Sequence, residues 1–142
     1  MNINCNAMVI SAQKASKLMR PGAAIIGISS LGSQRAVDGY AAVGIAKAAL
    51  EAAIRYLALA FAEKGIRVNG VSGGPVDTEG LRAFPDYRRR KQMCLAGTPM
   101  GRLGRAEDIA NIVLFLIKPE SMWICGQTLI ADGGLSLKLL TL

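Results

Sequence analysis

The chain has 142 residues, of which 51% are apolar and 19% are charged, so it can fold as one domain with a core and is not a disordered tail. Its 17 basic and 10 acidic residues give a formal net charge of +7, which favours an anionic partner. The absence of histidine excludes Ser-His-Asp and Cys-His catalysis, and the 5% aromatic content argues against a nucleic-acid module built on base stacking.

The three cysteines are far apart and odd in number, which indicates neither a disulfide framework nor a CxxC metal pair. This pattern fits a reducing, cytoplasmic location. The first residues lack the basic and apolar regions of a signal peptide, and the long apolar stretch 41–62 contains Lys47, Glu51 and Arg55, which excludes a membrane-spanning helix. We therefore expect a cytoplasmic protein with no membrane, metal or nucleic-acid partner.

The predicted elements alternate between helices and strands. In chain order they are a helix over 3–19, a strand over 23–29, a loop over 30–39, a helix over 40–64, a strand over 66–72, a charged helical insertion over 79–97, a helix over 106–116 and a strand over 127–131. Strands separated by helices are typical of right-handed crossovers on a parallel sheet. The predicted fold class is α/β.

The helix over 40–64 is apolar almost all round, which predicts burial on more than one side. One side would pack on the sheet. Four small residues would allow a second partner to approach closely: Ala42, Ala46, Ala49 and Ala53. That partner is either another copy of the chain, giving a homo-oligomer (dimer or tetramer) through this helix, or the chain's own first helix; the sequence leaves both open.

Tyr40 and Lys47 are seven positions apart, or two helical turns, so their side chains are expected on one helix face. Ser29 and Ser30 end the first predicted strand, at the carboxyl edge where open parallel sheets bind their ligands. A tyrosine, a lysine and a serine meeting there can form a proton-donating site. The alternative is an ordinary ion-pair ladder of Lys47, Glu51 and Arg55 at i, i+4 and i+8.

Three segments make the chain recognisable: IIGISSLGSQRAVDGYAAVGIAK (25–47), RVNGVSGGPVDT (67–78), and PMGRLGRAEDIANIVLFL with GQTLIADGG (99–134). Together they resemble the short-chain dehydrogenase/reductase family over essentially the whole chain. The usual member has a tyrosine four positions before the lysine, where this chain has Val43. The Tyr40-x6-Lys47 spacing resembles instead the enoyl-acyl-carrier-protein reductases, and the two turns look most like the type III enzymes.

The resemblance implies a reductase of fatty-acid biosynthesis that takes hydride from NADPH and reduces an enoyl-acyl-carrier-protein thioester. The displaced tyrosine would place the proton donor nearer to the thioester oxygen than in a ketoreductase. That position suits enoyl reduction, because negative charge develops on this oxygen. By resemblance, Tyr40 stabilises and protonates the enolate, Lys47 holds the nicotinamide ribose, and Ser30 matches the family's active-site serine. Asn4 resembles the asparagine that organises a proton-relay water.

The resemblance also implies a cofactor-binding set, namely Lys47, Ser29, Gly73, Gly74, Pro75, Val76 and Thr78. Glycine permits the close approach of backbone to a ligand, and Gly73-Gly74-Pro75 directly follows a predicted strand. The alternative for this segment is a plain turn.

Residues 79–100 are expected to cover the acyl substrate. The run Arg88–Lys91 either steers an acidic carrier protein or is a solvated helix face. Met93, Leu95 and Met100 line an acyl tunnel or pack in the core, and Trp123 and Cys125 are expected to pack.

No glycine-rich turn between a strand and a helix precedes the helix over 3–19. Residues 1–142 therefore look like a partial NAD(P)-binding, Rossmann-like domain: the carboxyl-terminal half with three strands, truncated, mis-started or dependent on a second chain. Its first strand would expose an unpaired edge. Two other functions stay open: a catalytically inactive half-domain that serves assembly, and another carbonyl reductase of the same family.

Overall fold

The computed structural model describes residues 1–138; the last four residues of the predicted domain lie outside them. The helices and strands are α1 (Ala7–Ala15), β1 (Ala24–Ser30), α2 (Ala41–Phe61), β2 (Arg67–Gly73), α3 (Glu79–Arg82), α4 (Tyr87–Gly97), α5 (Ala106–Ile117) and β3 (Thr128–Ala131). A π-helix (Asn2–Asn6) precedes α1, and short 3-10 turns follow β1, α2 and α5.

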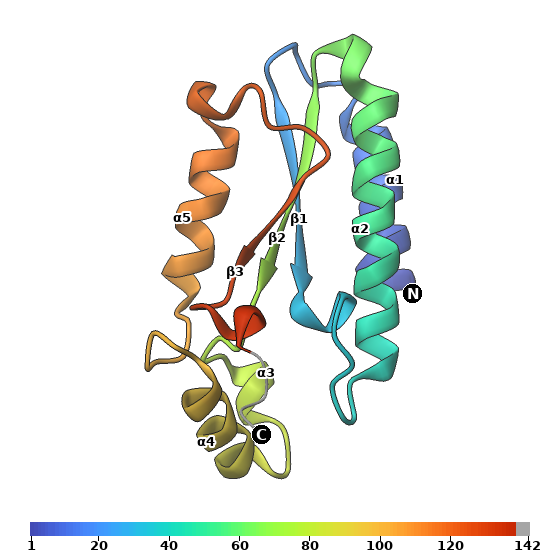
Figure 1. Cartoon of the computed structure of the whole chain (residues 1–142). Coiled ribbons are helices and arrows are strands. Elements are labelled where there is room, and N and C mark those ends of the chain that lie inside the picture. Colours follow the sequence, from blue (N-terminus) through green and yellow to red (C-terminus); the bar gives the residue numbers. More distant parts are fainter. Residues whose placement is uncertain (139–142) are drawn as a thin grey trace.

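The three strands form one parallel sheet in the order β1-β2-β3. Helices α1 and α2 cover one face and α5 covers the other, while α3 and α4 lie beyond the carboxyl ends of the strands (Figure 1). Ser30 is in register with Gly73, and Gly73 with Ala131, so the three strands end together. This arrangement confirms the predicted α/β class and the three-strand, Rossmann-like sheet.

Two predicted helices differ from the structure. The helix predicted over 3–19 begins as a π-helix and ends at Ala15, four residues early. The helical insertion predicted over 79–97 is divided into α3 and α4. Pro85 lies between them, and a proline disfavours helical backbone at the residue before it.

The core lies between α2 and the sheet. Its buried apolar side chains include Leu50, Ile54, Leu57, Phe61, Ile66 and Val68, with Met8 and Val9 of α1 packed against them. Glycine in β2 allows this close packing, because a Cβ at Gly70 would lie 2.8 Å from Ile54 Cδ1 and 2.6 Å from Thr128 Oγ1. The helix therefore approaches the strands more closely than a larger residue would permit.

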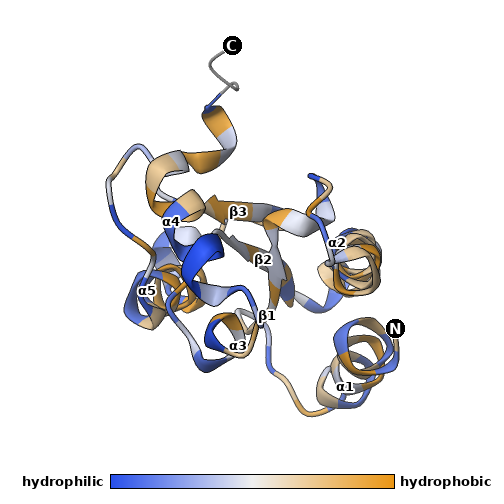
Figure 2. Cartoon of the chain, turned by 90° about the horizontal axis from the view of Figure 1, so that it is seen from below, coloured by the Kyte–Doolittle hydropathy of each residue, from blue (hydrophilic) through white to orange (hydrophobic). Residues whose placement is uncertain are grey.

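The face of α2 turned away from the sheet keeps an exposed apolar stripe. Ile45, Tyr56 and Leu59 are 65%, 77% and 78% exposed, and α2 is coloured as largely hydrophobic in Figure 2. The chain's own α1 thus covers only part of the helix. Of the four small residues predicted to face a partner, Ala46 is 1% exposed and packs inside the chain, so it does not face a second copy.

The outer edge of β1 pairs with no strand within residues 1–138, and Ile28 on this strand is half exposed. The expectation that Trp123 and Cys125 pack was wrong, since Trp123 is fully exposed and Cys125 is exposed. Both follow the turn after α5, at the opposite end of the sheet from α3 and α4 (Figure 1).

Candidate active site

Tyr40 lies at the start of α2 as its N-cap residue, one position before the first helical residue. Its ring rests on the turn that follows β1, because a Cβ built on Gly32 would lie 2.6 Å from two Tyr40 ring carbons. Gly44, one turn into α2, is equally close: its Cβ would lie 2.6 Å from the Gly32 carbonyl oxygen. Because these two glycines have no side chains, the Tyr40 ring and the start of α2 can lie close to the turn at the carboxyl end of β1.

Lys47 is half-buried, and its Nζ donates a 2.7 Å hydrogen bond to the carbonyl of Ile28 in β1. Burial lowers the pKa of this ammonium below its usual value, because desolvation penalises the charged form. An ammonium has three N–H donors, so two of them are left for a ligand. Lys47 and Asn4 line the same hollow of about 210 Å³.

The alternative prediction of an ion-pair ladder along α2 was wrong. Lys47 donates to Ile28, and no salt bridge joins Lys47, Glu51 and Arg55 within residues 1–138. Glu51 turns inward instead and is only 7% exposed.

Glu51 accepts hydrogen bonds from the turn that follows β1. Its Oε1 accepts from the hydroxyls of Ser29 and Ser33, both at 2.5 Å, and its Oε2 accepts from Gln34 Nε2 at 3.4 Å. The sequence interpretation missed this role. A signal was present, since Glu51 shares the buried α2 face with Ile54 and Ala58 at helical spacing.

The two adjacent serines have different surroundings. The Ser29 hydroxyl is buried and donates to Glu51, while the Ser30 hydroxyl accepts a 3.3 Å hydrogen bond from the Gly32 amide at the start of the following turn. Ser30 is half-buried, at the end of the strand whose next turn carries the Tyr40 ring. The structure therefore brings Ser30, Tyr40 and Lys47 to one end of β1.

The turn after β2 is held by contacts within the chain. A Cβ at Gly74 would lie 2.6 Å from Asp132 Cβ, which by itself accounts for a glycine there. The Pro75 carbonyl accepts from the Gly104 amide at 2.9 Å, and Val76 bridges to the same residue. Thr78 caps α3 by accepting from the Leu81 amide. These contacts hold the turn at the carboxyl end of β2.

The insertion that is predicted to cover the substrate is tied to the segment before Tyr40 through Arg90. Its guanidinium pairs with Asp86 at 2.6 Å, lies 4.5 Å from the Phe84 ring centre and donates to the Asp38 carbonyl at 3.3 Å. Arg88 and Arg89 are exposed. Met93 and Met100 are also exposed, so the core-packing alternative does not apply to them.

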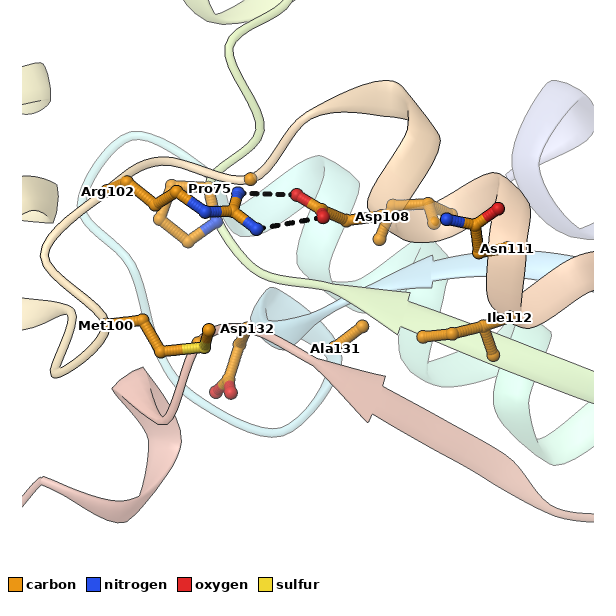
Figure 3. Close-up of a pocket in the computed structure, with 11 residues that line it drawn as sticks. Pro75, Met100, Arg102, Asp108, Asn111, Ile112, Ala131 and Asp132 are labelled. Carbon is orange, nitrogen blue, oxygen red and sulfur yellow. Dashed lines mark hydrogen bonds and ion pairs between the residues drawn. The ribbon is translucent and has the colours of Figure 1, made fainter.

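A larger hollow of about 280 Å³ lies between β3, the start of α5 and the loop before α5 (Figure 3). Arg102 pairs with Asp108 along one side, with hydrogen bonds of 2.6 and 2.9 Å, while Asp132 points away from this pair. Of the residues predicted for catalysis or for the cofactor, only Pro75 lines this hollow, and Met100 of the predicted acyl tunnel lines it as well. The hollow is therefore separate from the Tyr40 and Lys47 cluster.

Two further observations concern residues 1–138. None of their helices combines the length and apolarity needed to cross a bilayer. In the same part of the chain, no three His, Cys, Asp or Glu side chains are grouped so that they could share a metal ion.

A parallel sheet with helices on both faces and polar side chains at its carboxyl edge defines the class of Rossmann-like α/β proteins. The family model described as "Enoyl-(Acyl carrier protein) reductase" matches residues 1–136, and the chain belongs to this family of short-chain dehydrogenases/reductases.

The chain is similar to the enoyl-acyl-carrier-protein reductase FabI of Escherichia coli (strain K12), whose name specifies NADH; the two are 37% identical over 136 residues, 96% of this chain and 52% of FabI. It is 41% identical to the 1-cyclohexenylcarbonyl-CoA reductase of Streptomyces collinus, over 95% of this chain and 49% of the relative.

Among solved structures, the Bacillus cereus enoyl-acyl carrier protein reductase with NADP+ and indole naphthyridinone superposes with a TM-score of 0.92 at 30% identity. The match covers 98% of this chain and 54% of that one. The chain thus spans about half the length of the curated relatives it matches.

Proposed function

We propose that this chain supplies the catalytic half of an NADPH-dependent reductase that acts on enoyl-acyl-carrier-protein thioesters in fatty-acid biosynthesis. The observation that carries the proposal is the cluster at the end of β1, where the Tyr40 ring rests on the turn after Ser30 and the half-buried Lys47 ammonium bonds Ile28. This cluster uses the Tyr-x6-Lys spacing of enoyl reductases. The choice of NADPH rests on the type III resemblance, since the E. coli relative is named for NADH.

The residues at the carboxyl edge fit a nicotinamide dinucleotide. The Lys47 ammonium has two N–H donors left after its bond to Ile28, and ribose hydroxyls are suitable acceptors for them. Gly73 ends the neighbouring strand at the same edge, and Gly74, Pro75, Val76 and Thr78 follow it. These five residues are proposed to contact the cofactor together with Ser29. When bound, the nicotinamide supplies hydride to the β-carbon of the enoyl group.

Tyr40 is proposed to hydrogen-bond the thioester oxygen and to stabilise and then protonate the enolate. The positive charge of Lys47 on the same helix lowers the cost of negative charge at that oxygen. Ser30 is proposed to help fix the substrate from the strand side. Charge stabilisation of this kind accelerates the reaction because the charge develops only in the transition state.

We also propose that residues 79–100 cover the acyl chain and that Arg88 and Arg89 attract the acidic carrier protein. Both side chains are exposed, whereas Arg90 is held by Asp86 and Phe84, so the two outer arginines are free to meet a partner. Long-range attraction between opposite charges raises the rate of encounter. A cytoplasmic location fits such a partner.

The test is NADPH oxidation with a short enoyl thioester on the carrier protein, comparing Tyr40→Phe with the matched control Tyr56→Phe, whose ring is exposed on the same helix. Loss of the proton donor is expected to reduce kcat by about 100-fold or more while NADPH binding is unchanged. Full turnover by Tyr40→Phe would contradict the proposed role. Preference for a ketone would instead support another carbonyl reductase.

A second candidate is an inactive half-domain that serves assembly. Two surfaces favour it, because association would cover them: the exposed apolar stripe of α2, and the edge of β1 that pairs with no strand in the described part of the chain. Titration of the chain with NADPH separates the two functions. Saturable binding supports the reductase, and self-association without cofactor binding supports assembly.

A further inference from the structure

Glu51 is a buried carboxylate that forms no salt bridge in the part of the chain that the structure describes. It lies on the α2 face that carries Leu50 and Ile54 into the core. A buried carboxylate destabilises the fold unless hydrogen bonds replace its lost water. Packing alone therefore favours an apolar residue at this position.

All the side-chain hydrogen bonds to Glu51 come from one short segment. Ser29, Ser33 and Gln34 donate to it, and they lie 17 to 22 residues away in sequence. The Ser33 hydroxyl also lies 2.8 Å from the Ser30 carbonyl, so its single hydrogen is shared between Glu51 and the backbone of Ser30. The carboxylate is satisfied only when this turn has the observed conformation.

The same turn contacts two of the proposed catalytic residues, Ser30 and Tyr40. Its Gly32 amide bonds the Ser30 hydroxyl, and its Gly32 Cα faces the Tyr40 ring. Lys47, one turn before Glu51 on α2, bonds the carbonyl of Ile28, the residue before Ser29. Lys47 and Glu51 of α2 thus form hydrogen bonds with two consecutive residues, Ile28 and Ser29, near the end of β1.

We infer that Glu51 is a positioning residue: through Ser29 and Ser33 it fixes the turn 29–34 and thereby places Ser30 and Tyr40 for reaction. This inference rests on the proposed function for its catalytic consequence. The turn and the carboxylate depend on each other: a loosened turn leaves the buried Glu51 carboxylate without donors, and removal of the carboxylate leaves the buried Ser29 hydroxyl without its acceptor. Glu51 acts through these hydrogen bonds and does not itself contact the reacting atoms.

The test uses the 142-residue chain and the variants Glu51→Gln and Ser33→Ala. Glu63→Gln is the matched acid-to-amide control, since Glu63 is exposed, and Ile54→Val is a control that lowers overall stability from the same helix. The first readout is amide hydrogen exchange, resolved for residues 29–34 and for the core strands. The second is steady-state turnover with NADPH and an enoyl thioester.

Glu51→Gln and Ser33→Ala are expected to raise exchange in 29–34 by about tenfold relative to the core strands and to lower kcat by about tenfold, with the KM for NADPH within about twofold of wild type. Ile54→Val is expected to raise exchange throughout while kcat stays unchanged. If Glu51→Gln behaves like Ile54→Val, with uniform exchange and unchanged kcat, the positioning role is wrong.

The two readouts separate the inference from the proposed function. If wild type shows no turnover, the proposed reaction fails, and the exchange comparison alone still decides whether Glu51 fixes the turn. Ser33→Ala keeps the test open if Glu51→Gln does not fold, because Ser33 is only half-buried. Unchanged local exchange in Ser33→Ala would then overturn the inference.

Discussion

At the scale of single residues, the candidate site contains a lysine, Lys47, whose ammonium is half-buried and bonded to a strand backbone. Lys47 is the only α2 residue whose side chain bonds the β1 backbone within residues 1–138, and burial lowers its pKa. Burial removes part of the ammonium's hydration, and this desolvation is what lowers its pKa; a ligand with hydroxyl acceptors can replace that hydration. This is the physical basis for expecting a ribose there.

Replacing Lys47 by Gln is predicted to raise the Kd for NADPH by about tenfold or more, because hydrogen bonds to a charged group are lost. Fluorescence titration of NADPH measures the change. The control is Lys17→Gln, an exposed lysine beyond α1, which is expected to leave the Kd unchanged. An equal rise in the Kd for NADPH in both variants would show that NADPH binding depends only on the net charge of the protein and not on the position of Lys47.

A second residue-scale prediction concerns the glycine under the tyrosine. In Gly32→Ala the new Cβ would lie 2.6 Å from two Tyr40 ring carbons, so the ring must move. We expect kcat for enoyl reduction to fall by about 100-fold, since small displacements of reacting groups have large effects. Gly80→Ala is the matched control, because its Cβ would meet only Thr78 Oγ1 at 3.7 Å.

At the scale of elements, α5 begins with a polar cap that fixes the loop before it. Asp108 accepts from the Arg105 amide at 2.7 Å and pairs with the Arg102 guanidinium through both oxygens. The hydrogen bonds from Arg102 and then from Arg105 hold the pKa of Asp108 well below its usual range. A carboxyl with a lowered pKa in the folded state stabilises the fold when it is ionised.

Asp108→Asn is therefore predicted to lower Tm by about 2–3 °C at pH 7. The sign follows from the lowered pKa: the contribution is complete above the unfolded carboxyl pKa near 3.9 and is lost as the pH falls below it. Thermal unfolding of wild type and variant from pH 7 to pH 3 should show the difference shrinking. Glu107→Gln, in the same helical turn, is the control, and a constant difference across this range would contradict the assignment.

At the scale of the whole molecule, two surfaces are not covered by the elements within residues 1–138. The outer edge of β1 is unpaired within residues 1–138, and α2 keeps Ile45, Tyr56 and Leu59 exposed. A contiguous exposed apolar stripe on a helix is typical of an interface. A homo-oligomer through α2 remains a prediction, and the face of α2 that carries these three residues is its candidate interface.

Leu59→Glu is predicted to lower the molecular mass measured by light scattering, because a charge within an apolar interface is costly to bury. Leu114→Glu on α5 is the control, since Leu114 is half exposed on the other side of the sheet. Dissociation by Leu114→Glu and not by Leu59→Glu would place the interface on α5 instead.

Much of the architecture follows from local signals in the sequence. The apolar run 23–29, bounded by Gly22 and the loop after Ser30, predicts β1 almost to the residue, and IRVNGVS does the same for β2. Spacing and resemblance single out Tyr40, Lys47 and Ser30. Their roles in binding and catalysis stay predictions.

The sequence by itself determined the α/β class, the parallel order of elements and the enoyl-reductase family, because these depend on periodicity and on motifs that are local in the chain. Only the tertiary structure decided what each polar side chain of α2 touches. Lys47 and Glu51 look like an exposed ion pair by spacing, yet each bonds the end of β1. The reason is physical: a hydrogen-bond partner 19 or 22 residues away leaves no periodic trace, and burial of a charge is settled only when the strand and the helix meet.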